Sequence, residues 1–83
     1  MKYQFKPKGV CSREINFEVE NGIITEIGFV GGCDGNLKGI ASLVKGMNVN
    51  DVIAHLEGIT CGRKNTSCPD QLATALKELV VNA

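Results

Sequence analysis

The sequence predicts an α+β fold, in which an antiparallel sheet of about three strands is followed by three helices packed on one face of the sheet. Two observations lead to this prediction. Apolar and polar residues alternate in the first third of the chain, as they do in half-buried strands, and in the remainder apolar residues recur at helical spacing. Since the chain has 83 residues and contains no repeat, linker or low-complexity segment, we expect a single domain over residues 1–83.

The expected sheet is built around one hairpin. Between residues 14 and 20 every second residue is apolar, which predicts a half-buried strand. Residues 23–30 predict its antiparallel partner, and the alternating residues Tyr3 and Phe5 predict a short third strand.

The register of this hairpin depends on the length of its turn. A two-residue Asn21-Gly22 turn would place Phe17 opposite Glu26. A three-residue Glu20-Asn21-Gly22 loop would instead give the pairs Val19–Ile23, Phe17–Thr25 and Ile15–Ile27. We expect the three-residue loop, because it gathers the apolar residues on one face and because Gly22 readily adopts the left-handed conformation that it needs. Odd-numbered residues from 13 to 19 and from 23 to 29 would then face the core.

The rest of the chain predicts three helices. Their apolar stripes are Leu37, Ile40, Ala41 and Val44; Val49, Val52, Ile53 and Leu56; and Leu72, Ala75, Leu76, Leu79 and Val80. We expect Gly46 to end the first helix and Asn48 to cap the second. Pro69 fits the first turn of the third helix, where its missing N–H costs nothing.

Composition narrows the classes of partner. The nine Lys and Arg residues balance nine Asp and Glu residues, so the formal charge gives no broad attraction to nucleic acid or to an anionic membrane. No apolar run approaches the ~18 residues that span a bilayer, and the N-terminus lacks the apolar stretch of a signal peptide. We therefore expect a cytoplasmic protein without a membrane partner. Thiols stay reduced in that compartment, which favours metal ligation or redox chemistry over structural disulfides.

The four cysteines, Cys11, Cys33, Cys61 and Cys68, are expected to converge on one metal site. In the predicted register Cys11 and Cys33 are diagonal neighbours, roughly 7–8 Å apart at the backbone. Cys61 and Cys68 flank a polar loop, and Cys68 lies at the N-terminus of the last helix, where unpaired N–H groups favour a thiolate. Two other interpretations stay open: the cysteines are small buried hydrophobic residues, or they form a disulfide pair or a redox switch.

The neighbours of the cysteines have weaker predicted roles. Asp34 and Asp70 are expected at helix ends, with a second hypothesis that they contact the metal ligands. Arg63 and Lys64 could offset the negative charge of a four-thiolate site. We expect His55 to be a surface or packing residue. No Ser/His/Asp set or carboxylate pair stands out, so no catalytic residue is predicted.

The pentapeptide Thr66-Ser67-Cys68-Pro69-Asp70 resembles the signature of the TSCPD domain family. Further runs typical of its small stand-alone four-cysteine branch extend over nearly the whole chain: Gly32-Cys33-Asp34-Gly35-Asn36, Gly39-Ile40, Leu43-Val44, Gly46-Met47, Gly58-Ile59 and Cys61-Gly62. A similar domain occurs near the C-terminus of some adenosylcobalamin-dependent ribonucleotide reductases. Since 83 residues cannot hold the barrel of such a reductase, the resemblance implies an accessory module. In a reductase such a module could bind metal, contact nucleic acid or deliver reducing equivalents.

A weaker resemblance is to iron–sulfur cluster scaffolds of the IscU/NifU type. It is based on Gly32-Cys33-Asp34-Gly35, Leu43-Val44, Lys45-Gly46 and Cys68, which fall in the order of that family's motifs. By this similarity Cys33 and Cys68 would be ligands. Where the scaffolds have a histidine beside the last cysteine this chain has Ser67, and Cys61 has no counterpart in them.

Three functional hypotheses follow from these features. The first is a zinc-binding accessory module that contacts a partner protein, with a ribonucleotide reductase as one candidate. A shell of four thiolates with no open position is typical of structural zinc and favours this hypothesis. The second is an iron–sulfur cluster scaffold or carrier, and the third is a thiol redox module that reduces an enzyme. Nucleic acid or a nucleotide also stays open as a partner.

Overall fold

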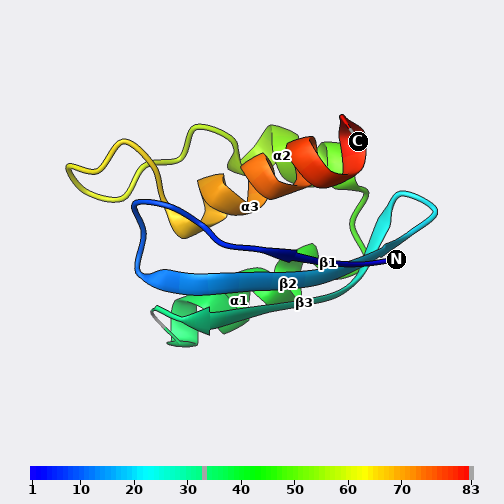
Figure 1. Cartoon of the computed structure of the whole chain (residues 1–83), viewed down its shortest axis with the longest axis horizontal. Helices are drawn as coiled ribbons and strands as arrows, with labels where there is room; N and C mark the ends of the chain where they lie inside the picture. Colours follow the sequence, from blue (N-terminus) through cyan, green and yellow to red (C-terminus); the bar gives the residue numbers. More distant parts are fainter. Residues whose placement is uncertain (33, 83) are drawn as a thin grey trace.

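The chain forms one three-stranded sheet followed by helices (Figure 1). The structure is a computed structural model that describes residues 1–32 and 34–82, without the side chain of residue 34. The antiparallel sheet has the order β1 (Lys2–Phe5), β2 (Ser12–Glu20), β3 (Ile23–Gly31). It is followed by α1 (Asp34–Val44), α2 (Val49–Leu56), α3 (Cys68–Leu76) and a π-helical turn, η1 (Lys77–Val81). The predicted α+β class, with three helices after the sheet, is confirmed.

The hairpin between β2 and β3 closes with a two-residue turn, so the predicted three-residue loop is wrong. Asn21 and Gly22 have φ angles of 53° and 76°. Two successive left-handed residues are typical of the type I′ turn, whose twist matches that of the flanking strands. Glu20 therefore pairs with Ile23.

A bulge on β3 restores the apolar pairing that the shorter turn would have lost. Thr25 is an extra residue on β3, and beyond it Phe17 lies opposite Ile27 instead of opposite Thr25. The predicted register is therefore wrong along the whole hairpin. Ile24 lies between the turn and the bulge, where it pairs with the inward-facing Val19 and is fully buried.

A second bulge changes which residues of β2 face inward near its start. Ser12 pairs with Gly31 and Glu14 with Val30, so that Arg13 is the extra residue. Arg13 was expected to face the core, but it is exposed and Ser12 is buried in its place. This exchange brings a hydroxyl group to the cysteine site described below.

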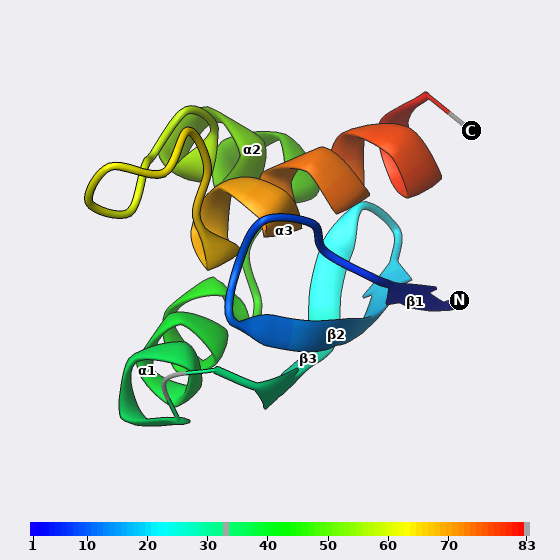
Figure 2. The same cartoon turned by 60° about the vertical axis from the view of Figure 1, so that its left-hand side comes forward.

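The core lies between one face of the sheet and the helices. Its buried members are Ile15, Phe17, Val19, Ile24, Val44, Val49, Val52, Leu72, Ala75 and Leu76. Helices α2 and α3 pack side by side, while α1 packs along β3 (Figures 1 and 2). All three predicted helical stripes contribute to this core or pack against it, which confirms them.

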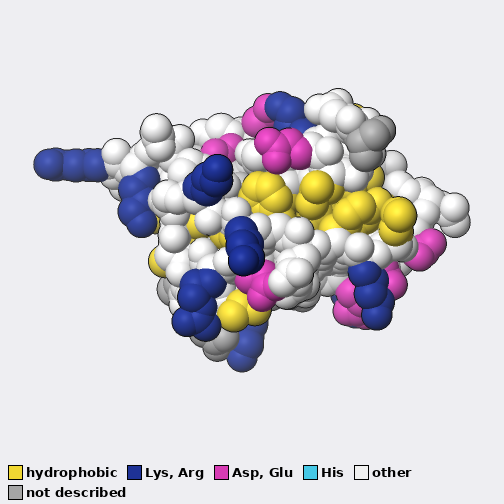
Figure 3. Space-filling model, in the orientation of Figure 1, with side chains coloured by type: hydrophobic (Ala, Val, Ile, Leu, Met, Phe, Trp, Pro, Cys, Tyr) yellow, Lys and Arg dark blue, Asp and Glu magenta, His cyan; other side chains and the backbone are white. Residues whose placement is uncertain are grey.

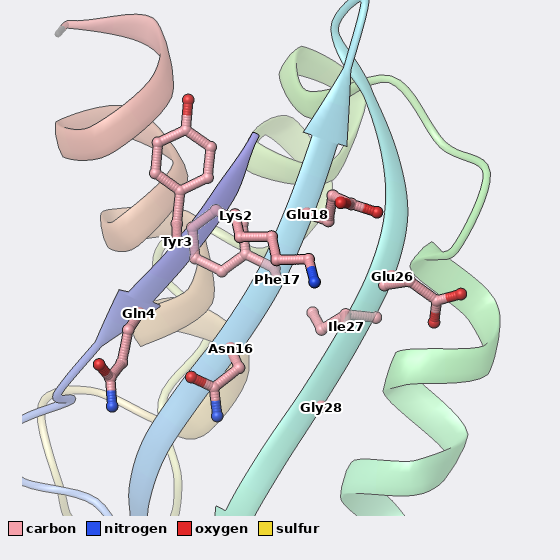
Figure 4. A pocket seen from close by; sticks show the side chains of 9 residues that line it. All are labelled: Lys2, Tyr3, Gln4, Asn16, Phe17, Glu18, Glu26, Ile27 and Gly28. Carbon is pink, nitrogen blue, oxygen red and sulfur yellow. The ribbon is translucent and has the colours of Figure 1, made fainter.

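The opposite face of the sheet is open and polar. Lys2, Asn16, Glu18 and Glu26 surround a shallow hollow over Gly28 (Figure 4). Acidic, basic and amide groups mix there, and Glu26 already pairs with Lys45 at 3.3 Å. Within residues 1–32 and 34–82, no helix is long and apolar enough to cross a membrane.

Helices α2 and α3 begin where the sequence predicts. The Asn48 side chain caps α2 by accepting a hydrogen bond from the backbone N–H of Asn50 at 2.8 Å. Ser67 is the N-cap of α3, with Pro69 in the first turn as predicted. Cys68 is therefore the first residue of α3.

Candidate functional site

A cleft of about 550 Å³ lies between α1, the loop that joins α2 to α3, and the N-terminus of α3. Cys11, Cys61 and Cys68 all line it. Three of the four cysteines predicted to form one site therefore border the same cleft. The predicted roles of Cys33 and of the Asp34 side chain lie outside the described residues.

Cys11 and Cys68 form the closest cysteine pair among the described residues. Their Sγ atoms are 4.0 Å apart, although 57 positions separate them in the sequence. Cys11 is exposed in the turn before β2, whereas Cys68 is buried. Both thiols are free, and the separation of their sulfur atoms is about twice the ~2.0 Å of a disulfide bond.

The surroundings of Cys68 favour its thiolate. Burial alone would raise the pKa of the Cys68 thiol, but hydrogen bonds outweigh this effect and lower the pKa below its ordinary value. The donors are the hydroxyl and backbone N–H of Ser12, followed by the thiol and backbone N–H of Cys11. The Ser12 Oγ atom lies 3.2 Å from the Cys68 Sγ atom. The first turn of α3 adds the positive end of a helix dipole.

Ser12 is a site residue that the sequence did not predict. It reaches Cys68 because the bulge at Arg13 turns it inward, and strict alternation would have pointed it to solvent. Close packing extends to Gly32: a Cβ atom there would lie 2.8 Å from the Leu37 Cδ1 atom and 3.3 Å from the Cys11 Sγ atom. Only glycine fits this position without displacing Leu37.

The serine of the pentapeptide fixes the start of α3. Ser67 Oγ accepts a hydrogen bond from the backbone N–H of Asp70 at 3.1 Å and donates one to the carbonyl of Ile59 at 2.6 Å. The same hydroxyl therefore caps the helix and holds the preceding loop against it.

The aspartate of the pentapeptide extends this attachment. The Asp70 carboxylate accepts hydrogen bonds from the backbone N–H of Gly58 at 2.8 Å and from the Thr66 hydroxyl at 2.5 Å. Gln71 in turn donates to Thr66 Oγ1 at 3.0 Å and accepts a hydrogen bond from the backbone N–H of Lys8 at 3.1 Å. Asp70 is thus a helix-end residue, as expected, and it ties the α2–α3 loop to the helix that carries Cys68. Gln71 attaches the loop before β2 to the same helix.

Cys61 lies on a different part of the cleft wall. It is exposed in the α2–α3 loop, where its N–H donates to the carbonyl of Thr66 at 3.1 Å. Arg63 and Lys64, further along this loop, are exposed as well. Among the residues that the structure describes, no three His, Cys, Asp or Glu side chains gather closely enough to hold a metal ion. The described structure therefore joins Cys11 with Cys68 and leaves Cys61 apart from them.

These features define a small α+β domain with a thiol pair at a helix N-terminus. The chain belongs to the TSCPD domain family, whose model matches residues 1–80 of the 83. No curated protein matches the chain, and no solved structure matches it. The relationships to ribonucleotide reductases and to IscU/NifU-type scaffolds stay predictions.

Proposed function

We propose that this TSCPD domain is a zinc-binding accessory module whose ligands are Cys11, Cys33, Cys61 and Cys68. One observation supports the proposal above the others: the Cys11 and Cys68 sulfur atoms are 4.0 Å apart without forming a disulfide. Tetrahedral Zn–S bonds of ~2.3 Å place two sulfur ligands about 3.8 Å apart. The pair is thus close to the spacing that one zinc ion requires.

The protonation chemistry of the pair agrees with this proposal. Zinc binds thiolates and not thiols, so a site is easier to form where the thiolate is already favoured. The hydrogen bonds from Ser12 and Cys11 lower the pKa of the Cys68 thiol despite its burial. The exposed Arg63 and Lys64 are available to balance the negative charge of four thiolates.

Cys61 and Cys33 complete the donor set in this proposal. Cys61 lies on the wall of the same cleft but apart from the Cys11–Cys68 pair. In this proposal it joins them by a movement of its loop, whose residues 57–65 are all exposed. Cys33 is proposed as the fourth ligand because its neighbours in the sequence border the site. Gly32 packs against Cys11, and Gly35 lines the cleft.

An accessory role agrees with the lack of a catalytic set in the sequence and with the resemblance to a domain of ribonucleotide reductases. In this proposal zinc stabilises the cysteine end, and the module then presents a surface to a protein partner such as a ribonucleotide reductase.

The same sulfur pair supports a second candidate, a thiol redox module. Cys11 is exposed, Cys68 has a lowered pKa, and their sulfur atoms need to approach by only about 2 Å to form a disulfide. In this alternative the pair would pass two electrons to a disulfide of the partner enzyme and become oxidised itself.

Metal analysis and absorption spectroscopy of protein purified under reducing conditions separate these functions. We expect one zinc per chain, no visible absorption, and loss of the metal in Cys33→Ser and in Cys68→Ser, with His55→Ala as the matched control that keeps it. A strong chelator should lower the melting temperature sharply, because structural zinc in small domains contributes apparent binding energies of ~10–16 kcal/mol at pH 7. Brown protein would favour a cluster scaffold. Metal-free protein with a reducible Cys11–Cys68 disulfide would favour the redox module.

A further inference from the structure

Two of the large apolar side chains that the molecule exposes line the cysteine cleft. Leu43 is 77% exposed and Ile59 is 43% exposed, and both line the cleft. Leu37, Ile40 and Pro69 continue its apolar lining towards the sulfur atoms. Single exposed hydrophobic residues need no explanation, but a connected apolar cleft is typical of a surface that binds something.

Unpaired basic side chains surround the same end of the molecule. They come from the two loops next to the cleft and from the start of β2: Lys6, Lys8, Arg13, Arg63 and Lys64. None of these makes an ion pair with any residue that the structure describes, whereas Lys45 and Lys77 pair with Glu26 and Glu57. Figure 3 shows Lys and Arg side chains gathered over the left-hand end, where these loops lie in Figure 1, with most Asp and Glu further to the right. The chain therefore has a basic end, although its formal net charge is zero.

We propose that the cleft docks a short segment of a partner protein that carries apolar side chains flanked by Asp or Glu residues. The apolar side chains would pack against Leu43 and Ile59, and the carboxylates would face the basic loops. A volume of about 550 Å³ lies in the range of sites that hold a few side chains. This surface goes beyond the proposed metal site and does not depend on a bound metal.

The chemistry of the cleft favours a peptide over a single-stranded nucleic acid. Among the residues that the structure describes, no aromatic side chain lines the cleft, and bases bind to single-strand sites mainly by stacking on aromatic rings. Phosphates would also leave the exposed Leu43 and Ile59 side chains without an apolar partner.

Four fluorescein-labelled 12-residue peptides test the proposal by fluorescence anisotropy with the full chain. They combine a central Leu/Ile-rich or Ser-rich segment with flanks of Glu or of Lys. We expect measurable binding of the Leu/Ile–Glu peptide alone, weakened by added salt because the charged flanks are screened.

Variants at exposed positions identify the binding surface. Leu43→Asp with Ile59→Asp should weaken binding by about tenfold or more, as expected for central interface residues, and Arg63→Glu with Lys64→Glu should weaken it and reduce its salt dependence. Val30→Asp and Val81→Asp, which change exposed apolar residues away from the cleft, are the matched controls and should bind normally. Unchanged melting temperatures would show that these variants fold.

Several results would overturn the proposal. These are equal binding of the Glu-flanked and Lys-flanked peptides, unchanged binding by the Leu43/Ile59 variant, or tighter binding of a 20-nucleotide single-stranded DNA than of any peptide. A dimer that Leu43→Asp dissociates would assign the cleft to a second copy of the chain instead. Because the same peptides are titrated into zinc-loaded and chelator-treated protein, failure of docking can be told apart from absence of a metal site.

Discussion

At the centre of the molecule, apolar side chains of the sheet pack directly against α2 and α3, whereas at the cysteine end the loops before β2 and before α3 border a cleft lined by sulfur and polar groups. Ile15, Leu72 and Leu76 are fully buried in the first region. In the second region, residues 57–65 are exposed throughout. Ser67, which donates to the Ile59 carbonyl, and Asp70, which accepts from the Gly58 N–H, attach this loop to α3. The two regions thus rely on different forces. Burial stabilises the core, while the cysteine end depends on a few polar contacts and, in our proposal, on a metal ion.

Removing a core side chain should have the largest effect on the metal-free fold. Leu72 is 0% exposed in the middle of the core, so Leu72→Ala should lower the free energy of unfolding by about 2–5 kcal/mol through lost burial and a residual cavity. Leu43→Ala, at an exposed helix position, is the matched control and should change it by less than about 0.5 kcal/mol. Urea unfolding measures both variants. Similar losses for the two would mean that Leu43 packs into the core, contrary to this account.

Breaking the polar attachment should have a smaller and more local effect. Asp70→Ala removes the acceptor for Gly58 and Thr66 and should cost about 1.5–3 kcal/mol, the range for hydrogen bonds to charged groups. Hydrogen exchange should quicken mainly in residues 57–67, with little change in β2. The control is Asp51→Ala, which removes an exposed first-turn acid from α2 and should cost less than about 1 kcal/mol. Uniformly faster exchange in Asp70→Ala would contradict a separate role for this attachment.

The smallest expected effect is a change in the pKa of the Cys68 thiol. In metal-free protein, Ser12→Ala should raise the pKa of the Cys68 thiol, because it removes the hydroxyl that donates to the thiolate. The chemical shift of the labelled Cys68 Cβ as a function of pH reports this pKa directly. A Thr74→Ala variant, which removes the hydroxyl that donates to the Asp70 carbonyl within α3, should leave it unchanged.

The same lowered pKa gives stability a defined pH dependence. Between the lowered pKa of the folded state and the ordinary pKa of the unfolded state, the unfolded chain binds more protons at Cys68 than the folded chain. The contribution of Cys68 is therefore complete above the unfolded pKa and is lost as the pH falls through the folded pKa. The free energy of unfolding of metal-free protein should therefore rise with pH over this range, and Ser12→Ala should make the rise smaller. An unchanged slope of the free energy of unfolding against pH would mean that Ser12 does not act on the Cys68 thiolate.

The central region was largely predictable from the sequence because its signals are local. Alternation around Phe17 and the helical stripe through Leu72 follow from burial of one face, and Asn48 and Pro69 mark helix starts by their own chemistry. The register was not predictable in this way. A bulge such as Thr25 leaves little trace in composition, yet it reverses the side-chain alternation of the strand beyond it.

The cysteine end was predictable only in part, for the same reason. The position of Cys68 at a helix N-terminus follows from Pro69, and its thiolate preference was anticipated. The approach of Ser12 depends on the bulge at Arg13, which alternation alone would exclude. The separation of Cys61 from the Cys11–Cys68 pair depends on loop contacts such as the bond from Cys61 to Thr66, which involve the backbone and no particular side chain.

Extended X-ray absorption fine structure (EXAFS) spectroscopy at the zinc edge counts the sulfur ligands around the ion, so it tests directly whether the four cysteines share one zinc site. The account predicts four sulfur atoms at ~2.3 Å in the wild-type protein loaded with one equivalent of zinc. In Cys61→Ser it predicts three sulfur atoms and one lighter ligand. Two sulfur atoms with two nitrogen or oxygen ligands in the wild type would contradict a shared four-cysteine site and limit the metal to the Cys11–Cys68 pair.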